Sequence, residues 1–144
     1  MLNKALEMAL ETGNMGDIAY SYKGMTRVAQ LSGDLESALM HAHHAIRWYE
    51  RSGATIDAVL CLDDVAGIAI DGGDPQRAAW FMGAVDGVLE KHGMHRTEIV
   101  SGENQLRVEQ VITQLGEVEW QLHHNRGRSM SAEEILAEVK SWLP

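Results

Sequence analysis

Three histidines stand close together in the first half of the chain, at positions 41, 43 and 44. On a helix, His41 and His44 lie one turn apart, so both imidazoles could reach one metal ion. Metal sites usually need three or four protein ligands, however, and no carboxylate or thiolate has a matching spacing. Neither an HExxH nor a CxxC motif occurs. We interpret His41, His43 and His44 as solvated surface residues, with adventitious nickel or zinc binding as the alternative. The same interpretation covers the remaining histidines, His92, His95, His123 and His124.

Groups suited to catalysis are sparse. Asp63 and Asp64 are adjacent, so a helix would point their carboxylates about 100° apart, which does not make an acid/base pair. Cys61 has no histidine beside it in the sequence, although the fold could supply one. Gly83 and Gly87 lie within an expected helix, where they favour close helix packing over phosphate binding. We expect no enzymatic activity, no cofactor and no metal. A small metal-dependent helical enzyme is the alternative from another functional class.

Composition narrows the class of protein. The 144 residues are enough for one domain with a real core, and 45% of them are hydrophobic. The net charge of −9 disfavours direct contact with nucleic acid, which needs clustered Lys and Arg. A single cysteine rules out an internal disulfide and indicates a reducing compartment, the cytoplasm. No apolar run approaches the roughly 20 residues of a membrane span.

Glycines punctuate the first two thirds of the chain. They stand 20 residues apart, at Gly13, Gly33, Gly53, Gly73 and Gly93. A glycine just beyond a helix is a common way to end it, because glycine enters the left-handed conformation without steric cost. Asp34 and Asp74 each follow one of these glycines and can cap the next helix, and Pro75 suits a first helical position.

This interval predicts helices with one apolar face each. They are Met1–Thr12, Asp17–Ser32, Leu35–Ser52, Thr55–Gly72 and Pro75–His92. Apolar residues within them recur at steps of three and four, as for Ala38, Ala42, Ala45, Ile46 and Tyr49. The last four helices form two antiparallel hairpins, Asp17–Ser52 and Thr55–His92, with a period of about 40 residues. Such repetition is typical of an all-α helical solenoid.

The pattern changes after Gly93. We expect a connector over Gly93–Glu103, helices over Asn104–Leu115 and Gly116–Asn125, and a last helix that opens at Ser131. Glu134 stands three residues after Ser131 and completes a capping box. The expected buried residues of the first and last of these helices are Val108, Val111, Ile112, Leu115, Ile135, Leu136, Val139 and Leu143. We therefore divide the chain into hairpin repeats over 1–93 and capping helices over 94–144.

The helix Met1–Thr12 matches the second helix of a hairpin whose first helix is absent. Since a solenoid repeat cannot bury its face alone, Met1 is expected to mark a cut in a longer protein. A natural N-terminal capping helix is the alternative. A cut would leave an apolar face uncovered, and such faces promote association, so a homodimer of the fragment is expected. The residues of that face are Leu2, Leu6, Ala9 and Leu10.

The hairpins resemble tetratricopeptide repeats of the long variety. In the first hairpin the matching residues are Tyr22, Met25, Thr26, Ala29, Gly33, Asp34, Ala38, Ala42 and Ala45. In the second they are Leu62, Val65, Ala66, Ala69, Gly73, Asp74, Ala78, Met82 and Val85. The family's glycine is replaced by Thr26 and Ala66, and its aromatic residue by Leu62. The resemblance implies antiparallel helical hairpins in a right-handed superhelix, closed here by the helical tail.

The tail is similar to the C-terminal end of large bacterial signalling regulators of the LuxR-type and MalT-like kind. The similarity rests on Trp120, the segment 127–134 (GRSMSAEE) and the apolar pair Ile135-Leu136. Those proteins join an ATP-hydrolysing switch module to tetratricopeptide-like repeats, often with a DNA-binding domain. The proline-rich connector that they often carry is missing after Gly93.

In tetratricopeptide arrays the first helix of each hairpin lines a concave groove, so the resemblance implies a binding groove here. Its expected residues are Tyr20, Lys23, Arg27, Gln30, Leu60 and Asp63, continued by Gly67 and Ile70. Lys23 and Arg27 are four apart and share a face, so together they could hold a carboxylate of a partner. Alternatively they pair with Asp63 or face water, where an ion pair contributes about 0–1 kcal/mol.

We therefore expect a non-catalytic recognition domain of a bacterial transcription regulator. It would bind a protein, a peptide or an inducer, or upstream domains of the same polypeptide, and would pass the bound state to an ATPase switch. The alternative is a free-standing adaptor that takes a peptide in its concave groove.

Overall fold

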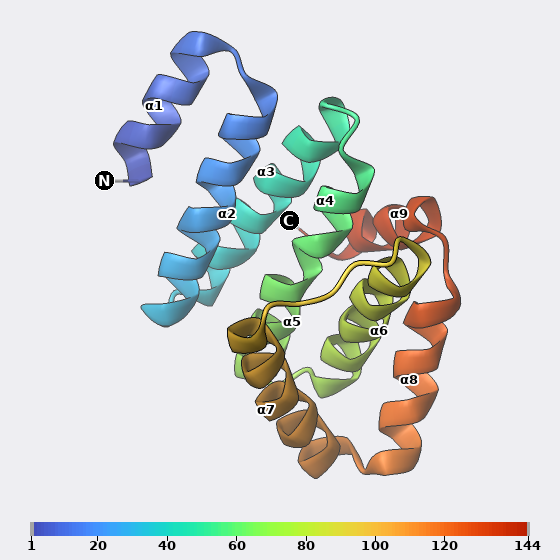
Figure 1. Cartoon of the computed structure of the whole chain (residues 1–144). Helices are drawn as coiled ribbons and strands as arrows, with labels where there is room; N and C mark the ends of the chain where they lie inside the picture. The colour runs from blue at the N-terminus through green and yellow to red at the C-terminus, as the bar shows by residue number, and fades with distance from the viewer. Residues whose placement is uncertain (1, 144) are drawn as a thin grey trace.

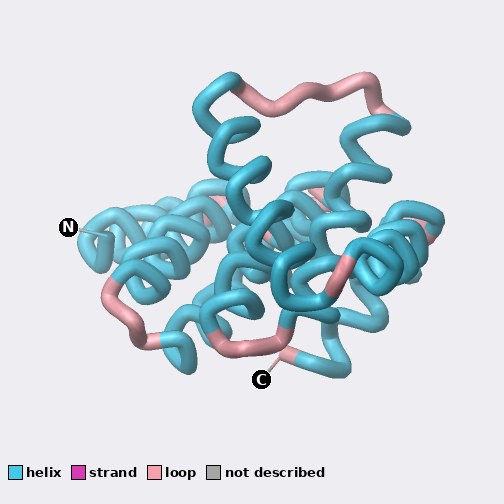
Figure 2. The backbone as a smooth tube through the Cα atoms, turned by 90° about the horizontal axis from the view of Figure 1, so that it is seen from below, coloured by secondary structure: helices cyan, strands magenta, loops and turns pink. Residues whose placement is uncertain are grey.

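The computed structural model describes residues 2–143, and within them the side chains of residues 4–98 and 100–143. Over these residues the chain is all-helical, without a strand, and short loops join the helices (Figures 1 and 2). The helices are α1 (Leu2–Thr12), α2 (Met15–Leu31), α3 (Leu35–Arg51), α4 (Thr55–Leu60), α5 (Leu62–Asp71), α6 (Pro75–Lys91), α7 (Glu98–Leu115), α8 (Glu117–Ser129) and α9 (Ala132–Trp142). Within residues 2–143, no helix combines the length and the apolar character needed to cross a bilayer.

The helix ends confirm the expected role of the repeated glycines. All five have positive φ, from 60° at Gly93 to 81° at Gly33. The side chains of Asp34 and Asp74 accept hydrogen bonds from backbone N–H groups at the start of α3 and α6. The expected start of the second helix at Asp17 is two residues late, because Asn14 caps α2 by accepting from the N–H of Asp17.

The single helix expected over Thr55–Gly72 is wrong, because the structure divides it into α4 and α5 at Cys61. There the carbonyl of Cys61 accepts from the N–H of Asp64 at 3.2 Å and from that of Val65 at 3.3 Å. The bond from Asp64 joins residues three positions apart, as in a 3₁₀-helix. This tighter turn interrupts the α-helical hydrogen-bond pattern. Leu60 and Asp63 therefore lie on opposite sides of a helix junction.

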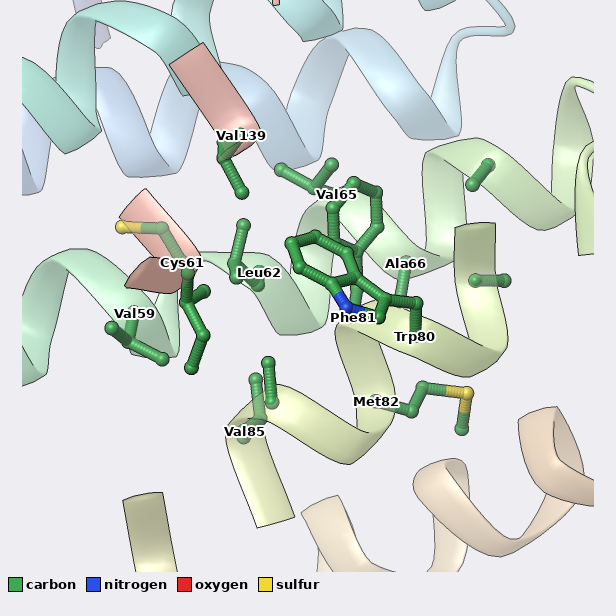
Figure 3. Close-up of a cluster of buried hydrophobic side chains, with 14 of the residues drawn as sticks. Val59, Cys61, Leu62, Val65, Ala66, Trp80, Phe81, Met82, Val85 and Val139 are labelled. Atoms are coloured by element: carbon green, nitrogen blue, oxygen red, sulfur yellow. The ribbon is translucent and has the colours of Figure 1, made fainter. Parts of the chain in front are cut away.

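One hydrophobic core extends from α3 to α9. Figure 3 shows side chains of α5, α6 and α9 meeting in it, among them Leu62, Phe81 and Val139. The apolar faces expected for α3 and α9 are confirmed, since Ala38, Ala42, Ala45, Ile46, Ile135, Leu136, Val139 and Leu143 are all buried and Tyr49 is half-buried. Among the described side chains of α7, Val111 alone is fully buried, and Val108, Ile112 and Leu115 are half-buried. The tail therefore packs against the core mainly through α9 and much less through α7.

The connector expected over Gly93–Glu103 is also wrong in its second half. Helix α7 begins at Glu98, and the Thr97 side chain accepts from the N–H of Val100 at 3.3 Å. Helix α8 continues to Ser129, four residues beyond the expected end. The first turns of α7 have almost no apolar face, so hydrophobic periodicity could not reveal them. The capping box of Ser131 and Glu134 is confirmed.

Helices α6 and α8 cross at backbone contact, which confirms the packing role expected for Gly83 and Gly87. A Cβ atom added at Gly83 would overlap the carbonyl of His124, and one at Gly87 would overlap that of Arg128. Gly127 meets the carbonyl of Trp80 from the other side. Three glycines therefore set the distance between these helices.

The uncovered face expected on the first helix is largely wrong. Helix α1 packs against α2, which buries Ala9 to 6% exposure and half-buries Leu6. Leu10 is 50% exposed, as expected, and the side chain of Leu2 lies outside the described residues.

Candidate functional site

A cavity of about 410 Å³ lies where α2, the α4–α5 junction and α7 meet the end of α6. It is called the groove cavity below. Four of the six expected groove residues line it, and these are Lys23, Arg27, Leu60 and Asp63. The other lining residues are Asp64, Leu89, Met94, His95, Arg96, Thr97, Val100, Glu103, Asn104 and Arg107.

Two expected residues do not join this cavity. The Tyr20 side chain is 72% exposed on α2. Gln30 turns to α5 instead, where its amide donates to Asp71 at 3.4 Å. The expected continuation at Gly67 and Ile70 is buried in packing. The site is therefore limited to the half of α2 that faces α7.

Helix α7 supplies the part of the site that sequence reasoning missed. Its residues Glu103, Asn104 and Arg107 form one wall of the groove cavity, and Arg96 precedes it in the loop. The apolar pattern predicted this helix from Asn104 onwards, and the one signal for its earlier turns was Thr97 followed by Glu98, a helix start with an acidic first turn. Nothing in the sequence spacing indicates that this helix lies against α5.

Arg96 joins the loop before α7 to two helices. Its guanidinium contacts the carboxylate of Asp86 on α6 at 2.6 Å and that of Asp63 on α5 at 3.1 Å. Only 13% of its side chain is exposed. Burial lowers the pKa of Arg96, but the carboxylates of Asp63 and Asp86 raise it by more, so the net shift of this pKa is upward. Arg96 is thus a permanently charged clamp between α5 and α6.

The same charge network reaches α8 through Asp86. His124 lies 2.7 Å from the second carboxylate oxygen of Asp86, and its ring packs beside Trp120 at 4.9 Å. Burial raises the pKa of Asp86, but hydrogen bonds from His124 and Arg96 outweigh burial and lower it. Asp86 therefore stays ionised as the centre of a link between the loop and α8. The interpretation of His124 as a solvated residue is wrong.

Asp64 is the acidic group buried deepest at the cavity wall. Burial raises its pKa, and the positive charges of Lys23 and Arg107 only partly oppose that shift. Arg107 also donates to the backbone carbonyl of Asp63 at 3.1 Å. Arg107 is therefore bound to α5. Lys23 lines the same cavity as Asp64 and has no ion pair within 4.0 Å to any described residue.

Arg27 has a different partner from the one expected. Its guanidinium lies 3.8 Å from the carboxylate of Glu103 on α7, with 39% and 50% of the two side chains exposed. Asp63, the partner considered from the sequence, is bound by Arg96 instead. An exposed pair at this distance contributes little stability, so the guanidinium of Arg27 can exchange Glu103 for another carboxylate.

The remaining candidates do not form a reactive site. Cys61 is 2% exposed, and burial raises the pKa of its thiol to about 12, which suppresses the nucleophilic thiolate. His44 stacks on Tyr22 with ring centroids 4.9 Å apart. Among the described residues, no three His, Cys, Asp or Glu side chains gather as a metal site.

Comparisons with protein-family models, with curated proteins and with solved structures found no match for this chain.

Proposed function

We propose that this chain is a non-catalytic recognition module that binds a carboxylate-bearing ligand or peptide in the groove cavity. The observation that carries the proposal is the gathering of four of the chain's 12 Lys and Arg side chains around one cavity. In a chain with a net charge of −9, these four cations come from two helices and one loop and line the same cavity.

The four cations divide into two pairs with different tasks. Arg96 and Arg107 are bonded to groups of the chain itself and hold the walls together. Lys23 and Arg27 stand one turn apart on α2 and have no strong ion pair among the described residues. A ligand carboxylate can therefore bind Lys23 and Arg27 without breaking the hydrogen bonds that Arg96 and Arg107 make within the chain.

The walls also offer apolar surface next to the cations. Leu60, Leu89, Met94 and Val100 line the same cavity. A concave site with apolar walls and a few convergent polar groups is the usual form of a ligand site. The volume suits a small dicarboxylate, or one acidic side chain of a peptide.

The architecture proposed around this site is a tetratricopeptide-like superhelix. The support comes from the antiparallel helix pairs α2–α3 and α5–α6 and from the positive-φ glycine at each 20-residue interval. By its resemblance to the ends of bacterial signalling regulators, we place the module in a cytoplasmic transcription regulator. A ligand that binds two conformations of the full protein unequally would shift its switch module.

The test is a titration with glutarate followed by NMR of the Lys and Arg side chains. We expect saturable shifts at Lys23 and Arg27, and loss of binding by at least about tenfold in the double variant Lys23→Glu, Arg27→Glu, equal to about 1.4 kcal/mol. The matched control is Lys4→Glu with Arg128→Glu, since both residues are exposed and neither lines the cavity. Equal affinities for the two double variants would refute the proposal.

A further inference from the structure

A second cationic surface lies on α3, outside the groove cavity. It is formed by His43, His44, Arg47, Trp48 and Arg51, and is called the basic face of α3 below. His44, Arg47 and Arg51 are exposed, and the other two residues are half-buried. None of these residues lines the groove cavity.

The positive charge of this face is not neutralised by its surroundings. Glu50 is the acidic residue beside it, and Lys140 of α9 binds that carboxylate at 2.9 Å. Arg51 lies over the Trp48 ring at 4.9 Å from its centroid. Within the described residues, neither Arg47 nor Arg51 has a carboxylate within 4.0 Å. In a chain of net charge −9, two such arginines on one helix face are an unusual concentration of available donors.

The surface is hollowed on both sides of these arginines. A hollow of about 330 Å³ lies toward α9, and His43, Arg47, Glu50, Arg51 and Lys140 line it. A second hollow of about 360 Å³ lies toward α2 and is lined by Tyr22, His43, His44, Arg47, Trp48 and Arg51. His43, Arg47 and Arg51 belong to both hollows, so they form a ridge that two neighbouring side chains of one ligand could straddle.

The aromatic groups make this face firmer than a typical patch of long cationic side chains. Tyr22 stacks on His44 at 4.9 Å, and His43 meets His44 edge to face at 6.0 Å. The indole of Trp48 supports the guanidinium of Arg51. Tryptophan and arginine are the residues most enriched among binding hot spots, because rigid rings and planar guanidinium groups lose little entropy when a partner docks.

We propose that the basic face of α3 binds an acidic peptide segment of a partner protein. Bidentate carboxylate binding is the geometry for which guanidinium groups are suited, and the two hollows provide room for two acidic side chains. A nucleic acid is the poorer fit. Phosphate-backbone binding relies on several cations in a row, whereas two free arginines on a strongly acidic chain would be opposed by the rest of its surface.

The test is an NMR titration with an oligo-glutamate peptide, using the indole N–H signal of Trp48 and the Nε–H signals of Arg47 and Arg51. We expect saturable shifts at α3 and its neighbours in the two hollows, and these shifts should persist in the variant Lys23→Glu, Arg27→Glu, whose groove cavity has lost its free cations. Arg47→Glu should weaken binding at least about tenfold. Lys4→Glu on α1 makes the same change in net charge at an exposed site and should leave the affinity within about twofold.

Three outcomes would overturn the proposal. The first is the absence of saturable shifts at Trp48, and the second is equal affinity of the Arg47→Glu and Lys4→Glu variants. The third is tighter binding of a single-stranded DNA oligonucleotide than of the peptide at the same salt concentration. The variant Lys23→Glu, Arg27→Glu should retain peptide binding at α3, so this proposal and the groove proposal succeed or fail separately.

Discussion

The guanidinium of Arg96 and the carboxylate of Asp86 lie 2.6 Å apart, ten positions from each other along the chain. This contact closes the loop between α6 and α7, and the second arm of Arg96 reaches Asp63 on α5 at 3.1 Å. Arg96 thus binds one carboxylate on α5 and one on α6 just before α7 begins, and Arg107 of α7 adds a hydrogen bond to the backbone of α5. Among the side chains of α7 that the structure describes, one apolar residue, Val111, is fully buried, so polar contacts have a large share in placing this helix.

Replacement of Arg96 should therefore destabilise the fold. We expect Arg96→Met to lower the free energy of unfolding by about 3 kcal/mol, because it leaves Asp63 and Asp86 partly buried without their cation. Urea denaturation measures the loss. Arg128→Met is the matched control, since Arg128 binds Glu90 at 2.9 Å but 50% and 55% of these side chains are exposed. The control should cost at most about 1 kcal/mol, and similar losses in both variants would contradict the clamp.

Because the backbones of α6 and α8 are in contact, replacing Gly83 and replacing Gly102 should change the stability in opposite directions. Gly83→Ala should destabilise the protein by at least about 1–3 kcal/mol, because the new methyl group meets the backbone of His124 and cannot be accommodated by rotating a side chain. Gly102→Ala on α7 has open space around its Cβ position and should gain up to about 1 kcal/mol in helix propensity. Thermal unfolding measures both effects: the midpoint temperature should fall for Gly83→Ala and rise for Gly102→Ala.

The carboxyl group of Asp64 should make the stability of the fold depend on pH. Burial raises its folded-state pKa above the ordinary value of 3.8, so the folded state keeps the proton longer than the unfolded state does. Stability is then lost as the pH rises from 3.8 through the raised folded-state pKa. Asp64→Asn should be more stable than the wild type at neutral pH, and this advantage should vanish near pH 3.8.

Urea denaturation across that pH range measures the effect, and Lys23 provides the internal control. Lys23 opposes the upward shift of the Asp64 pKa, so Lys23→Met should enlarge the advantage of Asp64→Asn at neutral pH. An advantage that does not change with pH would show that the substitution acts by packing instead.

If the groove cavity has the proposed function, removing the negative charge of Glu103 should strengthen ligand binding. Its carboxylate lies 3.8 Å from Arg27, where a ligand carboxylate would bind. Glu103→Gln removes this competitor and should tighten glutarate binding several-fold, with little effect on stability, because the pair is exposed. Glu109→Gln lies on the same helix, is exposed and does not line the cavity, so it is the matched control. Isothermal calorimetry of the two variants makes the comparison.

The repeat region could be predicted from the sequence because its signals are local. A glycine with positive φ and an aspartate cap act within one turn of a helix end, and the alternation of small and large apolar residues fixes each buried face. Gly33, Asp34 and Ala38 are one example in which all three signals agree. The break at Cys61 was missed because the apolar pattern continues across it, with Val59 and Leu62 both buried.

The groove cavity was predictable only in part, because half of it comes from distant residues. The resemblance to tetratricopeptide repeats indicated Lys23 and Arg27, and the structure brings these residues to one cavity with Leu60 and Asp63. Arg96 could not be found in this way. Its two partners lie 33 and 10 positions away, and no periodic pattern specifies such a contact.

The glycine crossing of α6 and α8 has a mechanical consequence. At Gly83, Gly87 and Gly127 no side chain of these glycines separates the two backbones, so α6 and α8 should move together as one rigid unit. Helix α7, by contrast, is tied to its neighbours largely by polar contacts, those of Arg96 in the preceding loop and of Arg107 and Glu103 on the helix itself. We therefore expect a displacement of α8 to carry α6 with it, and we expect movement in this part of the molecule to occur between α7 and the α6–α8 pair.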